Sequence, residues 1–238
     1  LVGSEMCIRD RAYTYFNANS LSEDGSSASS SNVFAISTHI APIYPMYIRD
    51  GEGNIMIDKN GYKMYDYGDG ENGGLGRPFM SGSNAYSATM LNENNAEGNA
   101  INAMGFAELR FLKDFKFTWT SSVNVDETRS TAFTNPYYGQ YASQNGMLYK
   151  YHTRNLAYNH QQLLNWKRSF GSHNLDVMLG HESYRYKYYY LYASKSNMFD
   201  PTNHELAGAI TENGNNSYTT DYNLSLIHIS EPTRLQLI

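Results

Sequence analysis

The first group of side chains that could bind a metal ion lies near residue 50. Asp50, Glu52, Asn54 and Asp58 offer the alternating oxygen ligands of a calcium loop. Ile55, however, stands where the sixth position of such a loop requires glycine, and no flanking helices are expected. A turn rich in Asp and Gly is therefore the stronger interpretation.

The other candidate metal ligands are weaker. Asp66, Asp69 and Glu71 form an acidic loop, which we expect to be solvated rather than to hold a cation. His152 and His160 are eight residues apart on a predicted strand, so they share a face but lie too far apart to chelate one ion. We assign no metal ligand and expect no cofactor.

Candidate catalytic groups are equally poor. His181-Glu182 lacks the second histidine of a metalloprotease motif and lies on a predicted strand. We therefore expect a structural role for the pair, at or near the lumen if the strands belong to a barrel. Acids are plentiful enough for the paired carboxylates of a glycoside hydrolase, but none has a context that would raise its pKa. Asn215-Asn216-Ser217 matches a glycosylation acceptor by chance. The sequence therefore predicts no catalytic residue and no enzyme.

Aromatic side chains are more prominent than ionisable ones. The chain has 22 tyrosines, and aromatic residues make up 14% of it. Tyr184, Tyr186, Tyr188, Tyr190 and Tyr192 alternate along one segment. Such a stripe could stack on sugar rings if it faced a lumen, or form an aromatic girdle at a membrane interface. We favour the girdle for at least part of it.

Both ends of the chain resemble translated adapter DNA. One duplex, read on opposite strands, encodes residues 1–11 and also residues 224–234, and it resembles the transposase end used in preparing sequencing libraries. We therefore expect residues 1–11 and 224–238 to be artefactual and residues 12–223 to be an internal piece of a natural protein. On this interpretation the absence of a signal peptide carries no information.

Composition excludes several classes of protein. The single cysteine, Cys7, lies in the expected artefact, which leaves the natural segment without disulfides or thiolate chemistry. The two ends remove three basic and three acidic residues, so the net charge stays at −5 and offers no footprint for nucleic acid. Mean hydropathy is −0.58, and no apolar run approaches the roughly 20 residues of a membrane helix.

The residue types favour an all-β fold. Tyr, Thr, Phe and Trp favour strands, Asn, Gly and Ser favour turns, and a high aromatic content is unlike a disordered chain. Two classes fit: a secreted sandwich or propeller, and a membrane barrel whose alternating strands escape a hydropathy scan. Alternation is clearest where Phe115, Phe117 and Trp119 are interleaved with polar residues. Five strands are predicted, over about residues 12–19, 103–111, 115–125, 147–167 and 173–193.

The predicted connections alternate in length. Short turns at 112–114 and 169–172 separate long connections at about 20–101, 128–146 and from 196 onward, which is typical of outer-membrane barrels and unlike sandwiches. Within the first connection we expect short hairpins over residues 50–100. Pro42 and Pro45 are expected to exclude a regular helix or central strand from residues 33–48.

One strand leaves two alternatives open. Leu175, Val177 and Leu179 share one face of the predicted strand 173–193, while the tyrosine stripe occupies the other. Either a bulge near Gly180 switches the faces, or the tyrosines face a lumen or rise above the lipid.

Residues Asn135–Asp200 closely resemble SusC/RagA-type TonB-linked outer-membrane transporters. The core of the resemblance is LLNWKRSFGSHNLDVMLGHESY, residues 163–184, which is a strand, a turn containing FG and a strand ending in GHE. Upstream, APIYPMYIRDGEGN, residues 41–54, resembles an external segment of the same family. The resemblance extends over most of residues 33–200 and weakens toward the loops.

The resemblance implies a 22-stranded transmembrane antiparallel β-barrel in the bacterial outer membrane. It implies an N-terminal plug, energy supplied by the TonB complex, and a SusD-like surface lipoprotein that closes over the external loops. Oligosaccharides or peptides would be the imported substrates. This chain would supply about five neighbouring strands, with turns 112–114 and 169–172 toward the periplasm. The plug and TonB box would lie outside it, and the matching motifs identify no substrate-contacting residue.

Two alternatives remain. A siderophore-type TonB-dependent receptor would share the barrel but lack the lipoprotein. A secreted all-β module that binds or degrades glycans would instead bury Phe115, Phe117, Trp119, Val123 and Val125 against a second sheet, whereas a barrel would present them to lipid.

Overall fold

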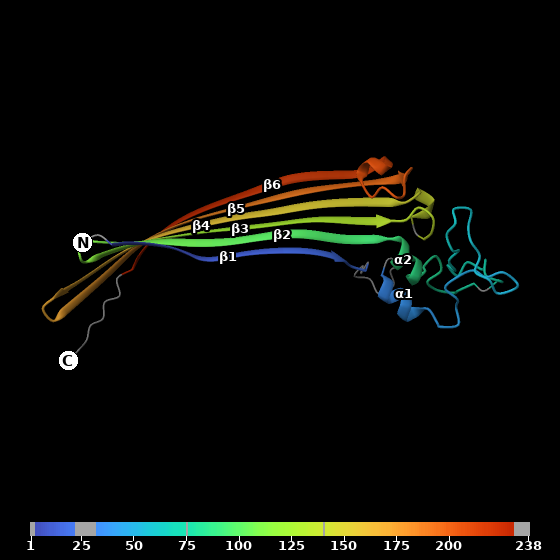
Figure 1. Ribbon diagram of the computed structural model, residues 1–238, viewed down its shortest axis with the longest axis horizontal. Coiled ribbons are helices and arrows are strands. Elements are labelled where there is room, and N and C mark those ends of the chain that lie inside the picture. The colour runs from blue at the N-terminus through green and yellow to red at the C-terminus, as the bar shows by residue number, and fades with distance from the viewer. Residues whose placement is uncertain (1–2, 22–31, 75, 140, 231–238) are drawn as a thin grey trace.

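One long antiparallel sheet makes up most of the protein. The computed structural model describes residues 3–21, 32–74, 76–139 and 141–230. Within these residues six strands pair in chain order (Figure 1), which confirms the predicted all-β class as an open sheet consistent with part of a barrel. The strands have 17 to 26 residues, whereas globular proteins usually have about 3–10. They are β1 (Gly3–Asn19), β2 (Glu93–Phe111), β3 (Phe115–Thr134), β4 (Met147–Phe170), β5 (His173–Met198) and β6 (Ala209–Ser230).

Short and long connections lie at opposite ends of the sheet (Figure 1). Turns 112–114 and 171–172 form what we call the hairpin end, and connections 20–92, 135–146 and 199–208 form the loop end. Leu112, Lys113 and Gly171 have φ values of 50°, 61° and 60°, the left-handed conformation that tight hairpins require. The predicted alternation is confirmed.

The strands are longer than predicted at the loop end. β2 begins at Glu93 instead of near 103, β3 continues to Thr134, and β5 continues to Met198. The strand β6 was not predicted. In these outer segments both faces of the sheet carry polar residues, so the apolar alternation disappears although backbone pairing continues.

Two short helices correct the interpretation of the first long connection. Helix α1 (Val33–His39) forms where Pro42 and Pro45 were expected to exclude a helix. It ends before Pro42, because proline restricts only itself, the residue before it and the preceding turn. Helix α2 (Ala85–Leu91) was also missed, although Asn84 is a favourable N-cap whose side chain accepts from the Ser87 N–H at 3.0 Å.

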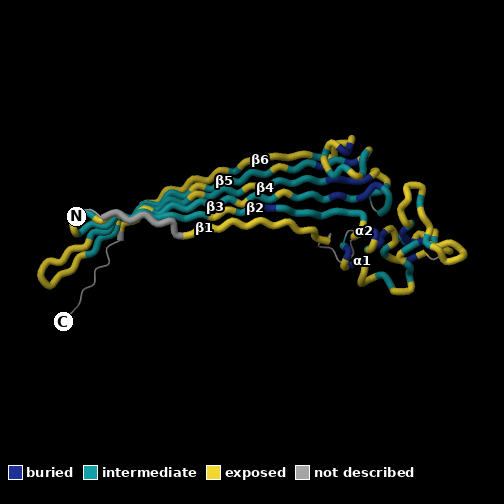
Figure 2. The backbone as a smooth tube through the Cα atoms, viewed as in Figure 1, coloured by how far each residue is buried: buried dark blue, intermediate teal, exposed yellow. Residues whose placement is uncertain are grey.

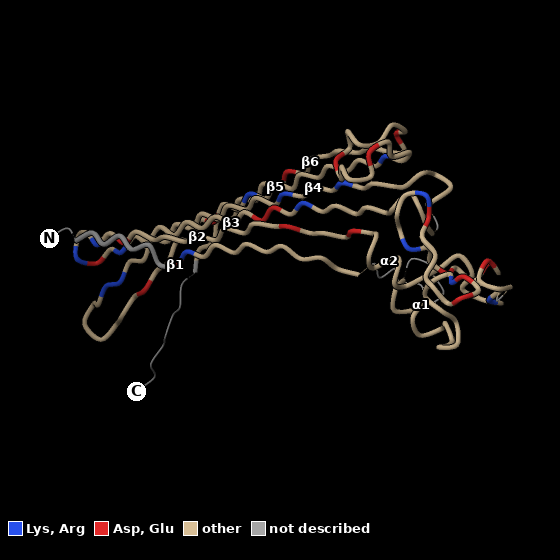
Figure 3. The backbone as a smooth tube through the Cα atoms, turned by 45° about the vertical axis from the view of Figure 1, so that its right-hand side comes forward, with Lys and Arg blue, Asp and Glu red and all other residues tan. Residues whose placement is uncertain are grey.

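The pairing register defines two faces of the sheet. Phe117, Leu164 and Leu179 lie side by side on what we call the apolar face. On the polar face Gln161 lies between Thr120 and Glu182. Figure 3 shows that β1 from Ala12 onward and the middle of β2 carry no Lys, Arg, Asp or Glu.

The middle of the sheet has no second layer within the described residues. Trp119 on the apolar face is 43% exposed, and the central strands are only half-buried (Figure 2). A small core forms at the loop end instead, where Leu206 packs on it. The residues 115–125 are therefore not enclosed between two sheets, as a sandwich would require. The core consists of Phe133, Leu148, Met198 and Ala209.

None of the helices in the described ranges is long and apolar enough to cross a membrane. The strands β1 and β6 run through the expected adapter boundaries at residues 11 and 224. A register shift in β1 falls between Ile8 and Asp10, close to the first boundary. Residues 231–238 and most of the Ser-rich loop at 20–32 lie outside the described residues.

Candidate binding site at the loop end

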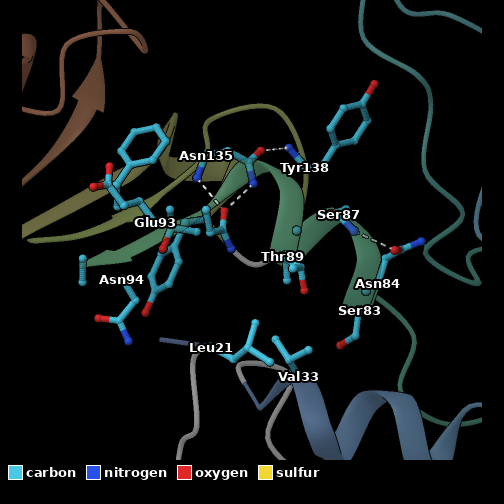
Figure 4. A pocket seen from close by; sticks show the side chains of 18 of the residues that line it. Leu21, Val33, Ser83, Asn84, Ser87, Thr89, Glu93, Asn94, Asn135 and Tyr138 are labelled. Atoms are coloured by element: carbon cyan, nitrogen blue, oxygen red, sulfur yellow. Dashed lines mark hydrogen bonds between the residues drawn. The ribbon is translucent and has the colours of Figure 1, made fainter. Parts of the chain in front are cut away.

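A cavity of about 260 Å³ opens at the loop end of the sheet (Figure 4). It lies between α2, the ends of β2, β3 and β4, and the connection that follows β3. Its lining mixes polar and apolar side chains and is almost free of charged residues, since Glu93 is the one acidic or basic residue among the described lining residues. The polar lining includes Ser83, Asn84, Ser87, Asn92, Asn135 and Tyr138.

Two buried asparagines hold the walls of this cavity together. The Asn84 amide donates to the carbonyl oxygens of Met46 and Asp66, at 2.9 and 2.8 Å. The Asn135 amide donates to Asn92 Oδ1 at 2.7 Å, and its own oxygen accepts from the Tyr138 N–H at 2.8 Å. The Asn84 bonds tie distant parts of the connection 20–92 to one another, and the Asn135 bond joins the residue before β2 to the segment after β3. Both amides are paired because a buried amide left unpaired would be costly.

Seven tyrosines pack together beside the cavity, and we call them the loop tyrosine cluster. The Tyr67 and Tyr138 rings are stacked at 5.9 Å, and Tyr138 meets Tyr65 edge to face at 5.3 Å. Burial raises the pKa of Tyr67 and of Tyr138, and raises the pKa of Tyr47 to about 12. These hydroxyls therefore stay neutral hydrogen-bonding groups. The cluster consists of Tyr47, Tyr62, Tyr65, Tyr67, Tyr86, Tyr137 and Tyr138.

A buried arginine supports the cavity from outside. Arg77 donates from Nη2 to the Ser83 carbonyl oxygen at 2.6 Å and packs against Gly68. Among the described residues the Ser83 hydroxyl is buried at the cavity and makes no hydrogen bond. A buried hydroxyl without a partner is one that a ligand group could satisfy.

We expect Gly68→Ala to loosen the cavity. Gly68 has a φ of +73°, and an added Cβ would lie 2.0 Å from Arg77 Nε. The substitution should destabilise this loop by about 1–3 kcal/mol, seen as faster hydrogen exchange over residues 66–84. The control is Gly70→Ala, at φ +94° with open space around it. Equal effects at both positions would show that strain, not the arginine contact, is responsible.

The Asp58 carboxylate predicts a pH dependence. Although desolvation opposes ionisation, donation by the Tyr62 N–H, the Tyr138 hydroxyl and Asn60 holds the pKa of Asp58 below its usual value of 3.8. Because the folded-state pKa is the lower one, this stabilisation is complete above the unfolded-state pKa and is lost as pH falls through the folded one.

Hydrogen exchange over residues 56–66 should therefore accelerate below about pH 4 in the natural sequence. The Asp58→Asn variant should exchange faster at neutral pH and lack that acid-induced step. The control Asp50→Asn removes a carboxylate that accepts from the N–H groups of its own turn in the same way, at Glu52 and Asn54, but does not contact Tyr138. A step that persists in Asp58→Asn would contradict this role.

The acidic residues considered as metal ligands are occupied by turns. Asp50 Oδ1 accepts from the Asn54 N–H at 2.8 Å, and Asp66 Oδ1 accepts from the Gly68 N–H at 2.7 Å. Asp69 likewise accepts from the Glu71 N–H at 3.2 Å. The Asp- and Gly-rich turn predicted at Asp50 is confirmed, whereas the expectation of a solvated acidic loop is wrong for Asp66, which is buried. Over the described residues no three His, Cys, Asp or Glu side chains come close enough to hold a metal ion.

The three histidines considered as functional residues lie on the apolar face, where each contacts a polar neighbour. His152 contacts Glu127 at 2.9 Å and His160 contacts Ser121 at 2.9 Å, on one face of β4 as predicted. His181 also lies on the apolar face, whereas Glu182 lies on the polar face. The two side chains therefore do not share a face, since neighbours on a strand point to opposite faces, and their expected position near a lumen stays a prediction.

The stripe Tyr184–Tyr192 also has a definite position. β4 and β5 pair without a register shift from Met147 to Phe170, so no bulge occurs near Gly180. The shift in β5 lies instead between Ser194 and Lys195. The tyrosines therefore lie on the polar face of the sheet, whereas Leu179 of the same strand lies on the apolar face. The sequence could not decide this, because strand register is a tertiary property.

Comparison with known proteins identifies the fold. No protein-family model matches the chain, and none of the curated proteins matches it. A solved structure of the RagAB peptide transporter matches with a TM-score of 0.54 and 21% identity, over 69% of this chain and 18% of the transporter chain. The RagAB peptide importer in its open-open and closed-closed states matches with the same TM-score and 20% identity, over 73% and 76% of this chain and 19% and 20% of the importer chain.

This chain therefore spans about a fifth of the length of those structures and shares its fold with that part of them. The solved structures that it resembles are transporters, and the shared part is an antiparallel sheet of long strands.

Proposed function

We propose that residues 12–223 form part of the barrel wall of a TonB-dependent outer-membrane importer of the SusC/RagA type. The observation that carries the proposal is the architecture of the sheet. Its long antiparallel strands have one apolar face, and they are joined by short turns at one end and long loops at the other. Part of a peptide transporter shares this fold. The sequence resemblance over residues 135–200 points to the same kind of transporter. The flanking residues 1–11 and 224–238 are proposed to be translated adapter DNA.

The protein would have no chemistry of its own. Its apolar face would contact lipid, the hairpin end would face the periplasm, and the loop end would face outward. A SusD-like lipoprotein would cover the loop end, and the TonB complex would act through parts of the transporter outside this chain. The imported substrate would be an oligosaccharide or a peptide, and the loop-end cavity is the candidate site where external loops contact it.

The lipid contact is tested by the fluorescence of Trp119, on the apolar face. The intact transporter that carries this segment is placed in vesicles with brominated acyl chains, which quench tryptophans in contact with lipid. The difference between the natural protein and its Trp119→Phe variant isolates the signal of Trp119, which should be strongly quenched. In the matched control, Thr120→Trp is added to that variant and places a tryptophan on the polar face, where quenching should be absent.

Each outcome separates the alternatives. If the tryptophan at position 120 were quenched and Trp119 were not, the polar face would be the one in contact with lipid. That result would overturn the proposed orientation of the sheet. A protein that does not associate with vesicles at all would be the secreted glycan-binding or glycan-degrading module. Copurification of a SusD-like lipoprotein distinguishes the proposed importer from a siderophore-type receptor.

A further inference from the structure

Nine tyrosines gather on the polar face of the last three strands, and we call them the tyrosine wall. The ring centroids of Tyr190 and Tyr218 lie 5.1 Å apart, and those of Tyr151 and Tyr192 lie 5.0 Å apart. Further ring pairs, at 5.7 to 6.5 Å, involve Tyr149, Tyr186, Tyr188 and Tyr222, and Tyr184 continues the stripe along β5. The wall is separate from the loop-end cavity, which it meets only at Tyr149. Its members are Tyr149 and Tyr151 of β4, Tyr184, Tyr186, Tyr188, Tyr190 and Tyr192 of β5, and Tyr218 and Tyr222 of β6.

The wall keeps its rings accessible. The five tyrosines of β5 are half-buried by one another and by their cross-strand neighbours, while Tyr218 and Tyr222 are 47% and 58% exposed. Alternate residues of a strand recur about every 6.6 Å, so the β5 rings form a regular ladder along the strand. A ladder of this kind presents ring faces with hydroxyl groups at their edges.

Charged side chains are segregated to the opposite face. Along the wall the polar face of β4, β5 and β6 carries no ionisable residue other than tyrosine. Arg154, Arg185, Lys187 and Asp221 of the same segments all lie on the apolar face. The other polar-face residues along the wall are Met147, Thr153, Asn155, Ala157, Asn159, Ser194, Ser196, Gly214, Asn216, Thr220 and Leu224.

Two carboxylates border this uncharged surface. Glu182 lies next below Tyr184 on the polar face and accepts from the Asn159 amide at 2.8 Å. Asp126 of β3 lies beside Asn155, whose oxygen accepts from the Tyr186 hydroxyl at 2.8 Å. Carboxylates accept hydrogen bonds from hydroxyl groups, whereas they would repel an anionic ligand.

We propose that the tyrosine wall is a binding track for neutral oligosaccharides. The proposal rests on the proposed function, which makes the polar face the lumenal one. Sugar rings have apolar faces that can pack on tyrosine rings and hydroxyl edges that pair with tyrosine hydroxyls, asparagines and the bordering carboxylates. When a neutral ligand binds to a wall without charged side chains, no charge on either partner is buried without a counter-charge. A charged peptide or metal chelate would need oppositely charged side chains on the wall. This placement also disfavours the aromatic girdle expected from sequence.

The test uses the intact transporter carrying this segment, purified in detergent and applied to an array of neutral oligosaccharides, charged oligosaccharides and peptides. The natural protein should retain neutral oligosaccharides. The double variant Tyr188→Ala/Tyr190→Ala should bind them at least about tenfold more weakly, because two ring contacts are lost. The variant Tyr188→Phe/Tyr190→Phe keeps both ring faces and should retain most of the binding.

The matched control is Tyr189→Ala, which removes the intervening tyrosine from the opposite face of the same strand. It should leave binding unchanged. Binding of peptides or charged ligands only, no binding of any neutral oligosaccharide, or equal losses in the control and the double variant would each overturn the proposal. The proposed function would fail separately, through loss of the Trp119 lipid contact.

Discussion

Expressed alone, this chain should aggregate and should not insert into a membrane as a monomer. In the six-stranded sheet β1 and β6 are edge strands, with 17 and 22 residues that each pair on one side only. Every unpaired backbone group placed in lipid costs several kcal/mol, and so long an edge in water is a template for pairing with other chains. Gel filtration in detergent should therefore find large aggregates in place of a monomer.

Heat-modifiable mobility on gels provides a second measurement. Closed barrels migrate differently before and after boiling, and this chain should show no such difference. The intact transporter treated in the same way is the control and should show it. A soluble monomer that unfolds cooperatively in detergent-free buffer would contradict the expectation and would favour a self-contained module.

Strands could be predicted from the sequence only in the part of the sheet where one face is apolar. Around Phe117 and Trp119 the alternation of aromatic and polar residues sets both the strand and its faces, and the turn at 112–114 follows. At the loop end of the strands this signal is missing. The segment around Gly214 has the composition of a turn, yet Gly214 pairs with Ser194 and Asn216 pairs with Tyr192 of β5, because cross-strand pairing outweighs the local preference.

The loop-end cavity could not be predicted for a different reason. Its walls depend on bonds between distant segments: Asn84 contacts Met46, 38 residues away, and Asn135 contacts Asn92, 43 residues away. Nothing in the sequence around either asparagine indicates these partners. The tyrosine wall could be predicted in part. The stripe of tyrosines in β5 was evident from the sequence, but the face of the sheet on which it lies depends on the register with β4.

The substitution Phe117→Arg should have a large effect on folding if the apolar face contacts lipid. Phe117 lies between Leu109 and Leu164 across the pairs of β3 with β2 and β4. An arginine on the lipid-facing side of a barrel strand costs about 2–4 kcal/mol near the middle of the membrane and less toward its surfaces. The intact transporter carrying Phe117→Arg should therefore fold into vesicles with a strongly reduced yield and unfold at lower urea concentration.

Two controls separate this effect from simpler ones. Thr118→Arg adds the same charge to the adjacent residue on the polar face, beside Glu108, and should cost little because that face is hydrated. Phe117→Ala removes the ring without adding a charge, so the difference between it and Phe117→Arg measures the charge alone. If Thr118→Arg were the more damaging of the two arginine variants, the polar face would be the one in lipid. The tyrosine wall would then be a membrane girdle, and the proposed sugar track would be lost with the orientation on which it depends.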